Sequence, residues 1–253
     1  MPKHIQNRFD SFKGIDAAGL KLIAMFTMLI DHLYHVIPNA GIWMRCVGRL
    51  AFPIFAFQVA EGIRKTHDRK QYIKRLWLFA FLSEIPFDLF TSGVPFNPSY
   101  QNVIFTLAMA ATIIALMNRM YDAISRPTFF ATTALLIGCA NGLSADYGWR
   151  GILIVILFYV CTPECRWLKR KYQTPVLLSA LVLINTVGQH AVLNAASPGP
   201  IGSIRVQSMA IYALIPIALY NGQKGRYGSV MQKCTYAFYP LHMLLLYLIR
   251  EVL

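Results

Sequence analysis

Long apolar runs recur along this chain of 253 residues, and they limit its possible folds more than any other feature. A helix needs about 20 mostly apolar residues to cross the hydrocarbon core of a bilayer. The runs fall at 17–37, 44–63, 72–90, 103–119, 128–144, 150–163, 175–192, 206–221 and 235–250. Only 14% of the residues are charged, whereas a soluble domain carries about 25%. We therefore predict an all-α, polytopic membrane protein of about nine transmembrane helices that forms one domain over 1–253.

Lysine and arginine residues are concentrated beside alternate runs. Nineteen of the 24 lie at the start of the chain or around the loops after the second, fourth, sixth and eighth runs. Cytoplasmic loops of membrane proteins are rich in these residues, so the distribution predicts a cytoplasmic N-terminus and an outward C-terminus. It also accounts for the net charge of +13 without a nucleic-acid partner. Because more spans follow the first run, we expect that run to be an uncleaved signal anchor.

Ionisable residues interrupt most of the predicted spans. Such residues are costly in hydrocarbon, so within a span they usually face a polar cavity and mark a site. Asp31, His32 and His35 lie near the outer end of the first span, and spacings of four and three residues allow His35 to share a helix face with Asp31 or with His32. Imidazole changes its charge near pH 7, which suits a general base. A hydrogen bond to a neighbouring helix is the structural alternative for either histidine.

Two further pairs have helical spacing. Arg45 and Arg49 lie at the outer start of the second span, and two arginines on one face can bind a phosphate or a carboxylate. Glu84 and Asp88 lie in the third span, where paired carboxylates can share a proton and act as an acid. Ion pairs between the arginines and the acidic residues are the structural alternative for both pairs. Pro53 predicts a kink in the second span.

The outer loops and the last span add more candidates. Asp146 lies in the loop between the fifth and sixth runs. Tyr239 and His242 lie in the last span, where Pro240 removes one backbone donor and frees a carbonyl. A histidine at mid-span is a functional candidate by its position, and a hydrogen bond to another helix is its structural alternative.

Motifs for nucleotides and metals are absent from the sequence. It contains no Walker loop, no glycine-rich dinucleotide motif, no His-x-x-x-His pair and no nucleophile elbow. The five cysteines have neither secreted-type spacing nor the partners of a metal site, so we expect no metal. The basic run 64–75 is typical of an orientation signal, and its alternative role is to bind a phosphate-rich ligand.

Six segments resemble the TraX family of bacterial membrane proteins and occur in the family's order. They are Leu20–His32, Gly48–Ala56, Ser83–Leu89, Asn102–Leu107, Asp146–Gly148 and Phe238–Leu244. The resemblance implies a multi-pass protein of the bacterial inner membrane that is associated with N-terminal acetylation of a conjugative pilin. The family is in turn similar to transmembrane acyltransferases, whose first helix begins with Ile-Asp or Leu-Asp and ends in histidine, here Ile15-Asp16 and His32. Their last helices often carry Tyr-x-x-His, here Tyr239 and His242.

This resemblance implies an acetyltransferase that uses acetyl-CoA and modifies an amine or hydroxyl group, such as the N-terminus of a pilin. His32 would be the base or a transient acyl carrier, and Asp31 or Asp146 would orient an imidazole. Arg49 would bind an anionic part of the donor or acceptor. His242 is a further catalytic candidate, and which of His32, His35 and His242 acts as the base stays open. The other residues expected near the substrate are Arg45, His35, Glu84, Asp88 and Tyr239. The residues expected to contact the phosphates of coenzyme A are Arg64, Arg69 and Lys70.

Two other classes of function remain open. Membrane-embedded Asp, Glu and His residues also carry protons in transporters, although this chain shows no internal repeat and its ionisable groups favour one side. A pilus-assembly scaffold without chemistry is the third possibility. It predicts that replacing His32, Arg49 and Asp146 leaves the phenotype unchanged.

Overall fold

The computed structural model describes residues 14–142, 144–162, 165, 168, 170–193, 206–225 and 229–252. Within these ranges the regular structure is entirely helical, apart from two isolated β-bridges, so the all-α prediction is confirmed. The elements are α2 (Ala17–Leu33), α3 (Trp43–Gly48), α4 (Ala51–Lys65), α5 (Arg69–Ser92), α6 (Val103–Met120), α7 (Arg126–Asn141), α8 (Gly148–Val160), α9 (Arg170–Leu193), η1 (Met209–Ala213), α11 (Leu214–Ala218) and α12 (Ser229–Val252). Each predicted apolar run coincides with one of these helices or with a consecutive pair.

Local signals in the sequence set the helix ends. Asp16 caps α2, because its Oδ1 accepts a hydrogen bond from the Gly19 N–H at 2.7 Å. Asn102 caps α6 in the same way through the Ile104 N–H at 2.9 Å. Gly93 ends α5 in the left-handed conformation that glycine adopts without strain, with φ of 74°.

The second apolar run forms two helices, α3 and α4. Between them, the Leu50 N–H donates to the Val47 carbonyl at 3.2 Å, in a tighter turn than that of an α-helix. Pro53 predicted a kink in this span, and the helix does break one turn before it, at Arg49 and Leu50. Pro53 has no N–H for the Arg49 carbonyl, and its ring would clash with that carbonyl in a continuous helix, so Pro53 lies in the first turn of a new helix, α4. The break leaves Arg49 between two helices, facing α2.

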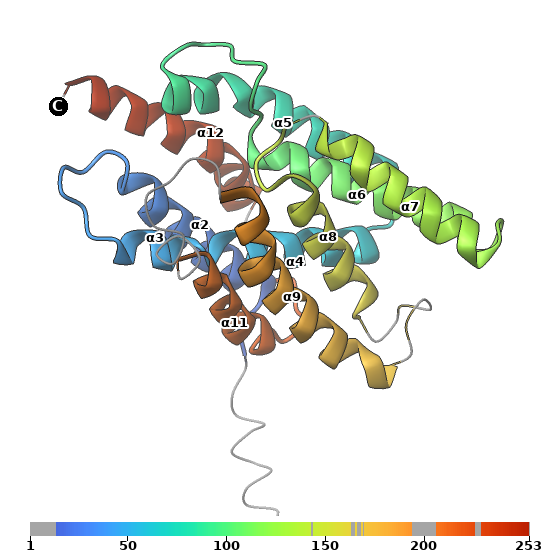
Figure 1. Ribbon diagram of the computed structural model, residues 1–253. Coiled ribbons are helices and arrows are strands. Elements are labelled where there is room, and N and C mark those ends of the chain that lie inside the picture. Colours follow the sequence, from blue (N-terminus) through green and yellow to red (C-terminus); the bar gives the residue numbers. More distant parts are fainter. Residues whose placement is uncertain are drawn as a thin grey trace, which may run out of the picture.

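The centre of the molecule lies where α4, α6 and α8 meet (Figure 1). Alanine residues of α6 are fully buried there, and their small side chains allow close approach of neighbouring helices. Phe52 of α4 and Ile152 of α8 fill the remaining space. Around this centre, α2 lies against α3 and α4, while α5 lies between α6 and α12.

Loops that the sequence assigns to the same side of the membrane meet in the structure. At one end of the bundle, the Asp146 N–H donates to the Gln101 carbonyl at 2.9 Å, which joins the loops before α6 and α8. At the opposite end, Lys65 Nζ donates to the Gly222 carbonyl at 2.7 Å, and the Asn221 N–H donates to the Ile15 carbonyl at 2.9 Å. We call these the Asp146 end and the Lys65 end.

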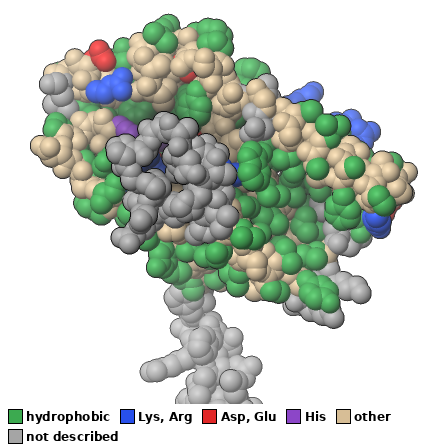
Figure 2. Space-filling view, viewed as in Figure 1, with side chains coloured by type: hydrophobic (Ala, Val, Ile, Leu, Met, Phe, Trp, Pro, Cys, Tyr) green, Lys and Arg blue, Asp and Glu red, His purple; other side chains and the backbone are tan. Residues whose placement is uncertain are grey.

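Large apolar side chains cover much of the outer surface (Figure 2). On α5, Phe81 is 63% exposed, and its exposed neighbours Leu78, Leu82 and Ile85 form a stripe at helical spacing. Two helical stretches, Trp43–Lys65 and Val103–Met120, are long and apolar enough to cross a membrane by themselves. Exposed apolar surface of this extent marks a contact with a membrane or with another protein. The stripe on α5 and the two long apolar stretches therefore support association with a membrane.

Candidate functional site

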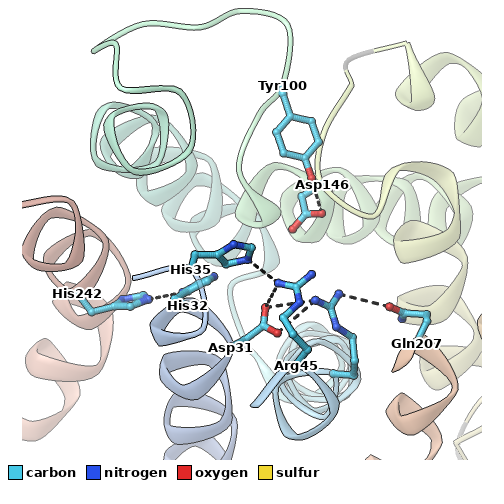
Figure 3. A network of polar contacts seen from close by, with 9 residues as sticks. Asp31, His32, His35, Arg45, Tyr100, Asp146, Gln207 and His242 are labelled. Carbon is cyan, nitrogen blue, oxygen red and sulfur yellow. Dashed lines mark hydrogen bonds and ion pairs between the residues drawn. The ribbon is translucent and has the colours of Figure 1, made fainter. Parts of the chain in front are cut away.

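Polar side chains from six segments converge at the Asp146 end (Figure 3). Four of these segments are α2 with the turn after it, α3 with the following turn, the loop before α8, and α12. The fifth is the loop before α6, which carries Tyr100, and the sixth is the short helical stretch before η1, which carries Gln207. The structure thus brings together most of the outer polar residues that the sequence singled out.

Asp31 is the centre of an ion-pair cluster. Its Oδ2 lies 3.2 Å from Arg45 Nη1, and its Oδ1 lies 3.2 Å from Arg49 Nη2. Gly48 makes this approach possible, because a Cβ at that position would lie 2.6 Å from Asp31 Cγ. Two guanidinium groups share one carboxylate, so the cluster carries one net positive charge. Both interpretations of the arginines therefore stay open, since ion pairing leaves positive charge to attract an anion.

Arg49 also reaches the segment before η1. Its Nη1 donates to Gln207 Oε1 at 3.4 Å, and Gln207 Nε2 donates to Asn185 Oδ1 of α9 at 3.2 Å. The Nε atom of Arg49 is buried and has no hydrogen-bond partner among the residues that the structure describes. Gln207 and Asn185 were not predicted, because each is an isolated amide in an apolar run and follows no motif.

His35 is tied to the same cluster. Arg45 Nη1 donates to His35 Nε2 at 2.6 Å. A guanidinium group cannot accept a hydrogen bond, so this ring nitrogen of His35 carries no hydrogen and is already occupied. Asp31 and His35 both contact Arg45, which agrees with the shared face that their spacing of four residues allowed.

His32 faces α12 and meets His242. The His32 Nδ1 and His242 Nε2 atoms are 2.8 Å apart, across 210 positions of sequence. The other ring nitrogen of His242, Nδ1, lies 2.7 Å from the Phe238 carbonyl in its own helix. Tyr239 is buried and presents its ring edge to His242 at 5.7 Å between centroids. The hydrogen bond between helices that was the structural alternative for both histidines is therefore present.

Asp146 lies across from the arginines, in a strained turn. Its Oδ1 accepts hydrogen bonds from the Tyr100 hydroxyl at 2.7 Å and from the Tyr147 N–H at 2.9 Å. Tyr147 adopts a left-handed backbone with φ of 64°, which costs roughly 1–2 kcal/mol in a residue other than glycine. Its ring lies parallel to that of Phe52 at 3.8 Å, and this contact holds the turn in place.

Burial shifts the pKa of Asp146 and that of Tyr100, which lies in the loop before α6. It raises the pKa of the Asp146 carboxyl group above its ordinary value, while the Tyr100 hydroxyl and Arg49 oppose the shift. Burial, together with the Asp146 carboxylate, also raises the pKa of Tyr100, so that residue keeps its hydrogen and acts as the donor. Tyr100 was not predicted, because its loop carries no catalytic motif.

Glu84 and Asp88 bind asparagines instead of arginines. Glu84 Oε2 accepts hydrogen bonds from the Asn102 backbone and side chain, and Asp88 Oδ2 accepts one from the Asn97 N–H at 2.8 Å. Their expected ion pairing with arginines was wrong, because this face of α5 meets the start of α6 and the preceding loop. Asp88 therefore fastens the loop 93–101 to α5, and Glu84 fastens the start of α6 to α5.

The basic residues expected to bind coenzyme A lie at the Lys65 end. Arg64 Nη2 is 3.6 Å from Glu61 Oε1, and Arg69 and Lys70 line an open surface depression of about 520 Å³ together with residues 66–68. The 15 residues of α4 separate this end from Arg49 by about 22 Å, at 1.5 Å per residue. The structure does not bring these residues to the Asp146 end.

Comparison with known proteins identifies relatives along almost the whole chain. Residues 16–250 match the family described as "TraX protein". The "Probable fimbrial assembly protein FimC, serogroup H1" of Dichelobacter nodosus is 29% identical over 248 residues, which cover 91% of this chain and 93% of the relative. A "Protein TraX" of Escherichia coli is 28% identical over 55% of this chain and 54% of its own length. The "Protein TraX" of Escherichia coli strain K12 is 32% identical over 54% of this chain and 52% of its own length. No solved structure matches the chain.

Proposed function

This chain belongs to the TraX family, and on that basis we propose that it is a membrane-embedded acetyltransferase. The donor would be acetyl-CoA, and the acceptor an amine or hydroxyl group, with the N-terminus of a pilin-like protein as the leading candidate. One similar protein is named for fimbrial assembly, and this supports an acceptor of that kind.

The observation that carries the proposal is the position of His32. Its Nδ1 is occupied by His242, while no described residue forms a hydrogen bond with its Nε2. Beside it, the Asp31, Arg45 and Arg49 cluster carries one net positive charge. A base next to an anion-binding group is what acyl transfer from a charged donor requires.

His32 would carry the proton from the acceptor to the leaving group. The neutral acceptor amine attacks the thioester carbonyl carbon, so that a C–N bond forms and the C–S bond breaks. His32 Nε2 takes the proton from the amine nitrogen and passes it to the leaving sulfur, which departs as the thiol of coenzyme A. The positive cluster would attract an anionic group of the donor or acceptor, with Arg49 making the contact.

Asp146 would assist from the opposite side. It lies within electrostatic range of Arg49 and keeps one oxygen outside its bonds to Tyr100 and Tyr147. In this position it would orient the acceptor amine. His35 would hold Arg45 in place, because its accepting nitrogen is already engaged.

Coenzyme A would enter from the Lys65 end, where Arg64, Arg69 and Lys70 would contact its phosphates. The thioester stands at the end of a long flexible arm, so the arm would extend along α4 towards His32. Separating phosphate binding from chemistry would allow a cytoplasmic donor to serve an acceptor at the outer face.

We place the whole bundle in the bacterial inner membrane, with about nine spans and a cytoplasmic N-terminus. Loops expected on the same side gather at the same end of the bundle, which supports this topology. The exposed apolar stripes of α5 and α12 support contact with lipid. Shorter elements such as α11 would cross only together with their neighbours.

Thiol release from acetyl-CoA by the purified protein in lipid nanodiscs tests the proposal, with a peptide that carries a pilin N-terminus as acceptor. We expect release in the parent, and a loss on the order of 10²- to 10⁴-fold in His32→Ala, since that is the range for a general base. Phe26→Ala is the matched control, because Phe26 lies on the same helix and is 64% exposed. Equal activity of His32→Ala and the folded parent would refute the assignment.

The His32–His242 pair also suits a second function, proton-coupled transport, because linked histidines can relay a proton. Proteoliposomes that take up a substrate under a pH gradient, without any thiol release, would favour the transporter. Against it, the ionisable groups gather at the Asp146 end, and no described chain of them runs to the Lys65 end.

A further inference from the structure

We propose that His242 fixes the tautomer of His32, so that Nδ1 of His32 carries the hydrogen and Nε2 is bare. His242 is then a positioning residue, and Nε2 of His32 is the atom that accepts the proton. The assignment of the tautomer follows from hydrogen bonding, and its catalytic meaning rests on the proposed function.

The first step is the hydrogen bond inside α12. A backbone carbonyl only accepts hydrogen bonds, so the His242 Nδ1 that lies 2.7 Å from the Phe238 oxygen must carry a hydrogen. A neutral imidazole has one N–H group. Nε2 of His242 is therefore bare and can only accept.

The second step is the contact between the two rings. His242 Nε2 accepts, so the His32 Nδ1 atom 2.8 Å away must be the donor. The ring planes differ by only 18°, and the nitrogens are much closer than the ring centroids, which are 5.0 Å apart. The rings thus meet edge to edge, as an N–H···N hydrogen bond requires.

The third step is the charge of the pair. If His242 were doubly protonated, the order of donors would reverse, but its surroundings oppose this. The Phe238 ring covers one face of His242 at 4.5 Å, and Phe90 presents an edge to His32 at 5.6 Å. The nearest charged cluster, around Asp31, is itself net positive. A proton added to the pair would place a positive charge among these aromatic rings and near the net positive cluster around Asp31. Both histidines are therefore neutral at rest.

His32, His35 and His242 are the three candidates for the base. His35 Nε2 receives the hydrogen of Arg45, and both nitrogens of His242 are engaged. Of these three residues, only His32 keeps a bare nitrogen without a described partner. When Nε2 takes a proton, the Nδ1–H bond to His242 strengthens and spreads the new charge over two rings.

Nitrogen-15 NMR of histidine-labelled protein in nanodiscs tests the tautomer directly, because protonated and bare ring nitrogens resonate in separate ranges. The spectrum of His32→Ala identifies the signals of His32. We expect a protonated Nδ1 and a bare Nε2 at neutral pH. A protonated Nε2 in the parent would overturn the inference.

Two substitutions of His242 separate its hydrogen bonding from its bulk. In His242→Phe the acceptor is lost, so we expect mixed tautomers of His32 and a kcat lower by on the order of tenfold, with KM within about twofold. In His242→Gln the side-chain oxygen still accepts from Nδ1, so we expect the parent tautomer and a smaller loss. Unchanged tautomer and kcat in a folded His242→Phe variant would also refute the inference. If that variant does not fold, the parent and His242→Gln spectra decide.

The tautomer of His32 and the release of thiol are measured independently, so either can fail without the other. Absence of thiol release in the parent would remove the acetyltransferase and leave the tautomer to be read from the spectrum. Thiol release with the wrong tautomer would keep the enzyme and remove the role of His242.

Discussion

Replacing Gly48 by alanine should loosen the contact between α2 and α3. The added Cβ would lie 2.6 Å from Asp31 Cγ, closer than non-bonded carbon atoms approach. The nearest obstructing atom is the Asp31 Cβ, which is fixed to the backbone of α2, and the carboxylate beyond it is held by two arginines. The clash is therefore relieved only if α2 shifts or an ion pair breaks. Overpacking costs about 1–3 kcal/mol, and alanine returns about 0.5–1 kcal/mol of helix propensity. The difference is about 0–2.5 kcal/mol, and we expect a loss in the upper half of that range in the free energy of unfolding, because the nearest contact is with the backbone-fixed Cβ of Asp31.

The measurement is unfolding of the purified protein in mixed micelles, followed by circular dichroism, beside the thiol-release assay. Gly138→Ala in α7 is the matched control, because a Cβ there meets nothing within 4 Å. That variant should be as stable as the parent or slightly more stable. Gly48→Ala should also lower the rate of thiol release, because the displaced Asp31 no longer positions Arg45 and Arg49.

Two results for Gly48→Ala would contradict these expectations. If Gly48→Ala is as stable as Gly138→Ala, then α2 and α3 do not approach each other as described, and the ion-pair cluster loses its structural basis. If Gly48→Ala is destabilised but releases thiol at the parent rate, the cluster serves folding alone.

Three further predictions address the loop, the surface and the donor site. Asp146→Asn keeps an oxygen that can accept from Tyr100 and Tyr147 but removes the charge, so stability should change little while kcat/KM for thiol release falls. An unchanged kcat/KM would exclude a role for that charge. Phe81→Lys places a charge in the exposed stripe of α5, at a cost of about 2.5–3.5 kcal/mol if that surface faces lipid. Its amount in the membrane fraction should drop, whereas a water-facing surface would tolerate it. Arg69→Glu with Lys70→Glu should raise the KM for acetyl-CoA with little change in kcat, and an unchanged KM would move phosphate binding elsewhere.

Much of the fold could be predicted because the bilayer leaves few choices. Each apolar run became helical, and loops assigned to the same side came together at the same end. The division of the second run agrees with Pro53, the visible helix breaker, because a proline excludes the carbonyl four residues before it from a continuous helix. The chain breaks at that residue, Arg49, directly after Gly48, and the close contact of Gly48 with α2 adds to this local signal.

Prediction of the site succeeded within helices and failed between them. A spacing of four residues placed Arg45 beside Arg49, and Asp31 beside His35, because helix periodicity is local. The choice of Asp31 over Glu84 or Asp88 as the partner of the arginines depends on how helices pack, which no spacing encodes. The His32–His242 pair is the clearest case, since it joins the first and last apolar runs.

The use of a neutral histidine to orient His32 follows from the charges around it. In the Ser-His-Asp triad, a carboxylate accepts the hydrogen of the base. Here a carboxylate at position 242 would be a buried anion against the ring of Phe238. It would also lie near the Asp31, Arg45 and Arg49 cluster, which carries net positive charge. It would be drawn towards Arg45 and Arg49 and would compete with Asp31 for them. A neutral acceptor fixes the tautomer of His32 without disturbing that cluster, so orientation of the base and binding of an anion can operate side by side.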